Sequence, residues 1–130
     1  MNIIKTFFAV IVPMGILDAI WLMAIAKPFY AKHLGFIMTK NPVWSAVVLF
    51  YILYAIGVAY FVVAPAVAGS IPWWNTLLRG ALFGLVAYAA YDLTNQATLA
   101  NWPAIVTIID LIWGAVITAI TSLIAYLILK

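Results

Sequence analysis

The sequence predicts an all-α integral membrane protein, folded as an antiparallel bundle of four transmembrane helices. Hydrophobic residues make up 69% of the 130 residues and charged residues only 7%, with a mean hydropathy of +1.23. A soluble domain carries far more charge. Four apolar stretches are each long enough to cross a hydrocarbon core of about 30 Å. They are continuously apolar and do not alternate as barrel strands do, so helices are predicted.

The four helices are predicted within a single membrane domain, residues 1–130, at about 6–26, 43–67, 76–100 and 103–129. The first connection runs from Lys27 to Pro42 and is polar. The second is a Gly, Ser and Pro turn around residues 68–72. The third, Asn101 to Pro103, is short enough that the last two helices must be adjacent and antiparallel.

Composition excludes several kinds of function. Six Lys and Arg residues give a net charge of +3 but form no cluster, so nucleic-acid binding is not expected. Cysteine is absent, which removes disulfides and thiolate metal sites. The one histidine, His33, lies in a polar connection and makes a poor metal site. No lysine lies in a span for retinal, a lone histidine cannot ligate haem twice, and no phosphate loop is present, so we predict neither cofactor nor metal.

The acidic residues give the strongest functional signal. All three, Asp18, Asp92 and Asp110, fall inside predicted spans, where a charge at the centre costs at least about 2.5 to 3.5 kcal/mol. Asp18 precedes Lys27, Asp92 precedes Asn101, and Asp110 follows Asn101, each by the same number of residues. We therefore predict that the three carboxyls share one layer, roughly 13 Å below one surface and facing the interior.

Aromatic and amide side chains surround this predicted layer. Each of two aspartates is followed three residues later by a tryptophan on the same helical face, and the third helix adds a tyrosine and an asparagine near Asp92. The predicted ligand-binding residues are Asp18, Trp21, Tyr88, Asp92, Asn95, Asp110 and Trp113. No catalytic residue is assigned.

Structural interpretations stand beside the functional one. Polar side chains also hold membrane helices together by hydrogen bonds, so the aspartates are open to that role alone. Gly80 and Gly84 are interpreted as small residues that let two helices approach closely. Tyr51 and Tyr54 are interpreted as packing and interface aromatics.

Several motifs give the chain a family resemblance. They are Leu17-Asp18-Ala19-Ile20-Trp21-Leu22, the run from Tyr91 to Leu99 that begins Tyr-Asp-Leu-Thr-Asn, Trp102-Pro103, and Ile109-Asp110-Leu111-Ile112-Trp113-Gly114. With these motifs the chain resembles, over nearly its whole length, a family of small bacterial inner-membrane proteins defined as a predicted-membrane domain of unknown function. The resemblance implies four spans and a bacterial cytoplasmic membrane, and it implies no activity.

The function predicted from these observations is a binding or permeation module. Its Asp, Asn and Trp layer would accept a cation, a proton or the polar part of an amphipathic lipid-like ligand. Two alternatives stay open: a membrane-embedded acid–base enzyme acting on a lipid-like substrate, which we favour less, and an accessory subunit packed against a larger membrane complex. The expected partners are membrane lipids and a lipid-like or cationic ligand, with a homo-oligomer or larger complex left open.

Overall fold

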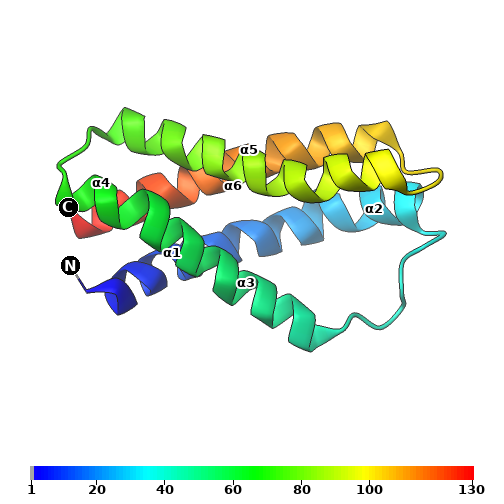
Figure 1. Cartoon of the computed structure of the whole chain (residues 1–130). Helices are drawn as coiled ribbons and strands as arrows, with labels where there is room; N and C mark the ends of the chain where they lie inside the picture. Colours follow the sequence, from blue (N-terminus) through cyan, green and yellow to red (C-terminus); the bar gives the residue numbers. More distant parts are fainter. Residues whose placement is uncertain (1) are drawn as a thin grey trace.

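The computed structural model describes residues 2–130 and is helical throughout, without strands in that range (Figure 1). Four continuous helical segments follow one another: α1 (Ile3–Trp21), η1 (Leu22–Ala26) and α2 (Lys27–Leu34); α3 (Trp44–Val58), η2 (Ala59–Val63) and α4 (Ala64–Ala68); α5 (Trp73–Thr98); and α6 (Ala104–Leu129). The all-α prediction is confirmed, while Met1 of the predicted domain lies outside the described residues. Residues 3–34, 44–68 and 104–129 are long and apolar enough to cross a membrane.

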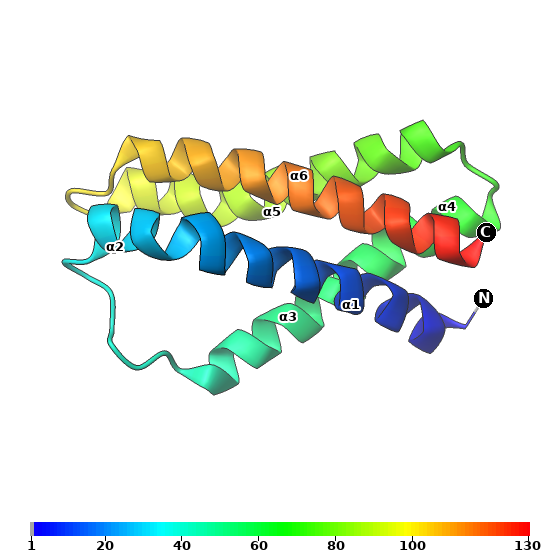
Figure 2. The same cartoon turned by 180° about the vertical axis from the view of Figure 1, so that it is seen from behind.

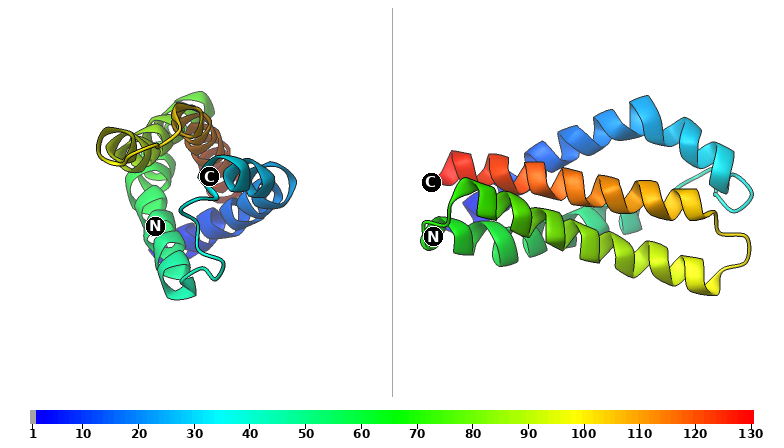
Figure 3. Two further views of the ribbon diagram at one scale, coloured as in Figure 1. Left: turned by 90° about the vertical axis from the view of Figure 1, so that its right-hand side faces the viewer. Right: turned by 90° about the horizontal axis from the view of Figure 1, so that it is seen from above.

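The first helix is longer than predicted. It continues past Lys27 to Leu34, so the predicted connection from Lys27 is wrong over its first eight residues. The sequence interpretation began the connection at Lys27 because the residues from there to Pro42 are polar. The helix also continues through Pro28, although proline lacks an N–H and its ring clashes with the carbonyl four residues earlier in a regular helix. A π-turn, η1, precedes this proline, and Lys27 N–H bonds the Leu22 carbonyl five residues back. That wider turn accommodates the ring, so the helix bends without ending (Figure 3).

The second segment repeats this device. Its π-turn, η2, lies just before Pro65, and Ala64 N–H bonds the Ala59 carbonyl five residues back. The observed bounds of the other three segments differ from the predicted ones by no more than three residues. The principal error in the helix bounds is therefore the end of the first segment, where polar residues continue the helix to Leu34.

α5 and α6 form the closest pair of helices in the described residues. They lie side by side in opposite directions (Figures 1 and 2). A Cβ atom on Gly84 would come within 2.0 Å of the Gly114 carbonyl oxygen, and one on Gly80 within 2.7 Å of the Thr118 carbonyl oxygen. Only glycine allows backbones this close, so the packing role predicted for Gly80 and Gly84 is confirmed.

The turn between α5 and α6 is fixed by a ring of hydrogen bonds. The Gln96 amide donates to the Trp102 carbonyl at 3.0 Å, the Trp102 indole donates to the Thr107 hydroxyl at 3.1 Å, and that hydroxyl donates to the Gln96 side-chain oxygen at 2.9 Å. Asn101 occupies the left-handed region at a φ of 63°, which asparagine tolerates in tight turns. The last two helices are thereby held in register.

α3 diverges from the α5–α6 pair. The connection of residues 35–43 leads from the end of α2 to the start of α3, which lies apart from α2 (Figures 2 and 3). The apolar core lies toward the end of the molecule that holds the two termini, where Val10 of α1, Val58 of α3 and Ile117 of α6 are buried together. The first half of α3 thus leaves space between itself and α5.

Candidate functional site

The three aspartates fall into two groups, Asp18 with Trp113 and Asp92 with Asp110, and the prediction that they share one layer stays a prediction. Asp92 lies six residues before the end of α5 and Asp110 six residues after the start of α6. Asp18 lies sixteen residues before Leu34, the true end of the first helical segment. Leu34 packs with Trp102 and so marks the same end of the molecule. Along its own helix Asp18 is therefore farther from this end than the other two aspartates are along theirs, and its partner Trp113 lies one helical turn beyond Asp110.

Asp18 is satisfied by donors from two other helices. One carboxylate oxygen accepts a hydrogen bond from the Trp113 indole of α6 at 3.1 Å. The other oxygen accepts a hydrogen bond from the Tyr51 hydroxyl of α3. The side chain therefore joins α1, α3 and α6, which is the arrangement expected of a polar contact that holds membrane helices together.

The two predicted tryptophans stack on each other. The rings of Trp21 and Trp113 are nearly parallel, with centroids 4.4 Å apart and an interplanar angle of 9°. Trp113 thus bonds the aspartate of the other helix and not the one three residues before it. The stack joins α1 to α6.

Asp92 and Asp110 form a separate pair on facing helices. Asp92 has no exposed surface and Asp110 is 6% exposed. Asp110 accepts a hydrogen bond from the Tyr30 hydroxyl of α2 and interacts electrostatically with Asp92. Asp92 accepts no hydrogen bond from a donor group such as a tyrosine or tryptophan of the described residues, and its carboxyl can share a hydrogen only with that of Asp110 beside it. A buried polar group of this kind carries its full desolvation cost.

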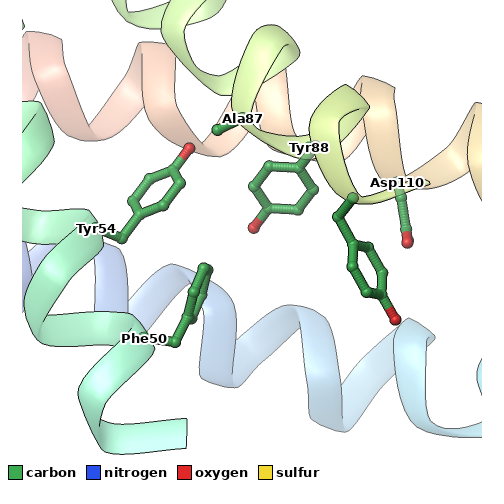
Figure 4. A pocket seen from close by; sticks show the side chains of 6 residues that line it. Phe50, Tyr54, Ala87, Tyr88 and Asp110 are labelled. Atoms are coloured by element: carbon green, nitrogen blue, oxygen red, sulfur yellow. The ribbon is translucent and has the colours of Figure 1, made fainter. Parts of the chain in front are cut away.

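A partly open cavity of about 450 Å³ has Asp110 at one end (Figure 4). Its lining comes from α3, α5 and α6 and consists of Phe50, Tyr54, Ala87, Tyr88, Tyr91 and Asp110. The Tyr54 hydroxyl is hydrogen bonded to the Thr118 hydroxyl at 2.7 Å. The walls are therefore mostly aromatic, with one carboxyl at one end.

The structure brings together part of the predicted set. Tyr88 and Asp110 line the cavity. Asp92 lies next to Asp110 but is not among the lining residues. Tyr88 packs directly against Gly114, where a Cβ would come within 2.3 Å of the tyrosine ring. Asp18, Trp21 and Trp113 form the other group, while half-buried Asn95 is not among the cavity-lining residues.

Sequence reasoning missed the contacts of three tyrosines. Tyr30 was placed in a connection, and Tyr51 and Tyr54 were interpreted as packing, yet all three take part in hydrogen bonds near the aspartates. The spacing of Tyr51 and Tyr54 was an available signal, because residues three apart share a helical face. Their partners could not be named without knowing how α3 lies against α1 and α6.

Comparison with known proteins gives one match. A family model described as "Predicted membrane protein (DUF2177)" matches residues 3–127. No curated protein and no solved structure matches the chain.

Proposed function

We propose, from the premise that this chain belongs to the predicted membrane protein family DUF2177, that it binds an amphipathic lipid-like ligand within the membrane. In this proposal all four helical segments cross a bacterial cytoplasmic membrane as an antiparallel bundle. The cavity between α3 and the α5–α6 pair receives the ligand, and the carboxyls of Asp92 and Asp110 meet its polar part.

The proposal needs α5 to cross the membrane although it is the least apolar of the four segments. Its length equals that of α6, which it accompanies along its course (Figure 1). Asp92 is turned inward, and Arg79 is paired with Asn75 at 2.7 Å near the start of the helix. Large apolar side chains cover the outer surface of α5, namely Leu78, Leu82, Leu85, Val86 and Leu93. These features support a spanning helix whose acidic residue, Asp92, is buried and whose basic residue, Arg79, lies near one end.

The absence of cysteine makes the topology testable. Single cysteines in place of Met38, Ile71 and Ala100 would report the side of each connection through a membrane-impermeant maleimide. Four crossings predict that Met38→Cys and Ala100→Cys are labelled from one side and Ile71→Cys from the other. Labelling of Ile71→Cys and Ala100→Cys from the same side would contradict the crossing of α5.

The observation that carries the binding proposal is the cavity that ends at the buried carboxyl of Asp110, which lies beside Asp92. Its volume of about 450 Å³ lies within the range of small-molecule pockets, roughly 300 to 1,000 Å³. All lining residues belong to helices and none to a connection. A ligand at this depth needs an apolar body for the aromatic walls and a polar group for Asp110.

The contrast with Asp18 supports a binding role over a purely structural one. A carboxyl that only joins helices should be paired, as Asp18 is by Tyr51 and Trp113. Asp92 is fully buried without such a partner. An accessory subunit would need neither this carboxyl nor the cavity, so that alternative has less support.

A membrane-embedded acid–base enzyme is a second candidate. It is favoured by the contact between Asp92 and Asp110, because one carboxyl of such a pair can donate a proton while the other accepts one. Mass spectrometry of lipid extracts after incubation with the purified protein would separate the two candidates. A chemically altered lipid supports the enzyme, and a retained but unaltered lipid supports the binding module.

A cavity-filling variant tests the binding proposal. Ala87 lines the cavity, so Ala87→Phe should occupy it without removing a polar group. Ala90→Phe is the matched control, because Ala90 is exposed on the same helix. We expect native mass spectrometry from lipid nanodiscs to show at least about tenfold less retained ligand for Ala87→Phe, and no change for Ala90→Phe. Equal retention by the parent and Ala87→Phe would overturn the proposal.

A further inference from the structure

We infer that the ligand of this cavity is a lipophilic monovalent cation, and that a proton is its alternative occupant at the Asp92–Asp110 pair. The inference rests on the proposed function and names the chemical class of its ligand. It follows from the placement of charge, the nature of the walls and the contact between the two carboxyls.

Acidic and basic side chains of the molecule differ in where they lie. Asp92 and Asp110 are buried, whereas all six basic side chains are exposed: Lys5, Lys27, Lys32, Lys40, Arg79 and Lys130. His33 packs against Phe29, with ring centroids 4.7 Å apart. Nothing basic lines the cavity. Two carboxyls with no internal counter-charge favour a cation and disfavour an anion.

The walls suit a cation with an apolar body. Phe50, Tyr54, Tyr88 and Tyr91 present aromatic rings around the cavity (Figure 4). Aromatic faces attract cations, and the attraction is stronger where water is excluded. A small hydrated metal ion would gain little from four rings, while an organic cation fits both the rings and the carboxyl end. The volume also suits an organic cation better than a bare ion.

A proton competes for the same place. The groups that face the two carboxyls are Tyr30 from α2 and Tyr91 from α5, and neither supplies a positive charge. Two adjacent buried carboxyls cannot both stay ionised by themselves. Either one of them takes up a proton and becomes neutral, or a bound cation balances their charge. When the organic cation binds, a proton leaves the pair for water, and when the cation leaves, the proton returns. Cation binding should therefore strengthen as pH rises, by up to about tenfold per pH unit for one proton.

Two ions of similar size and opposite charge test this inference. Tetraphenylphosphonium and tetraphenylborate would be added to the full chain in nanodiscs of uncharged lipid, and uptake by empty nanodiscs subtracted. We expect saturable binding of tetraphenylphosphonium only, at least about tenfold above any specific binding of the borate. Its affinity should increase as the pH rises.

Variants assign the effect to the pair. Asp110→Asn and Asp92→Asn should each weaken tetraphenylphosphonium binding at least about tenfold and flatten its pH dependence. Lys40→Gln changes one charge on an exposed connection and should alter neither property. Circular dichroism of each variant would verify that its helices are intact. Unchanged affinity in both Asn variants, or equal specific binding of the borate, would overturn the inference.

The test separates this inference from the binding proposal. If neither ion binds but Ala87→Phe still abolishes retention of an uncharged lipid, the cavity binds a ligand of another class and only the inference fails. If Ala87→Phe leaves both lipid retention and ion binding unchanged, the proposed function fails and the inference fails with it.

Discussion

Asp18 and Asp92 are the same residue type on two long helices, yet their surroundings differ. Asp18 accepts hydrogen bonds from Tyr51 and Trp113, each on a different helix. Asp92 faces a second carboxyl, that of Asp110, and accepts no hydrogen bond from a separate donor group of the described residues. The difference teaches that burial of a charge does not by itself mark a site. The missing donor is what distinguishes a candidate site from a contact between helices.

The largest expected effect is on stability, from loss of the paired aspartate. Asp18→Ala leaves the Tyr51 hydroxyl and the Trp113 indole without their acceptor, and it disconnects three helices. We expect the free energy of unfolding to fall by about 2 to 4 kcal/mol. Unfolding in mixed micelles would measure it. A loss below about 0.5 kcal/mol would contradict the role of Asp18 as a contact that stabilises the packing of the helices.

Asp92→Leu should have the opposite effect on stability. The substitution puts an apolar side chain of similar size in place of a buried carboxyl that no separate donor group satisfies. The free energy of unfolding should stay the same or rise by up to about 2 kcal/mol, measured in the same micelles. A loss as large as that of Asp18→Ala would show that Asp92 has a stabilising partner after all.

Asparagine variants sharpen the same contrast at nearly constant shape. Asp92→Asn and Asp110→Asn keep most of the packing, so thermal stability in detergent should change by only a few degrees, about 1 kcal/mol. Ligand retention, followed by native mass spectrometry, should nevertheless be lost. Retention equal to that of the parent in both variants would assign the pair a structural role.

The smallest effects are expected at the stacked tryptophans. Trp113→Phe removes the indole donor to Asp18 as well as part of the stack, whereas Trp21→Phe only reduces the stack. We expect losses of about 1 kcal/mol and a few tenths of a kcal/mol, respectively. Chemical unfolding of the two variants side by side would give the ranking, and a reversed order would question the bond from Trp113 to Asp18.

Much of the helical layout could be predicted from the sequence, because apolar length alone indicates membrane helices. The buried face of α5 could also be predicted, because Gly80, Gly84 and Asp92 are spaced in multiples of four residues and therefore lie on one face of the helix. In the structure that face packs against α6. The distance of Asp18 from its helix end was not predictable by counting, because the count began at the wrong helix end. The polar residues from Lys27 onward indicated a connection, and only the observed helix to Leu34 shows otherwise.

The composition of the site was predictable only in part. Asp110 and Tyr88 were identified because polar residues are conspicuous within an apolar span. Phe50, Tyr54 and Tyr91 resemble ordinary packing residues in a sequence this rich in aromatics. Their place around the cavity depends on the divergence of α3 from α5, a property of four helices together that no single segment encodes.

The π-turn η1 also sets the rotational phase of the residues that follow it. A π-turn holds one more residue than an α-turn, and each residue of an α-helix advances the side chain by about 100° around the axis. Tyr30 reaches Asp110 from a helix whose phase has been shifted in this way. A regular α-helix with the same number of residues would turn Tyr30 away from Asp110 by roughly a quarter of a revolution, whereas deletion of Ala24 with return to an α-turn would leave Tyr30 near its present phase. The π-turn thus absorbs one residue and keeps the Tyr30 face of α2 toward α6, so regularising this turn at constant chain length should affect the Asp110 environment more than deleting one residue from it.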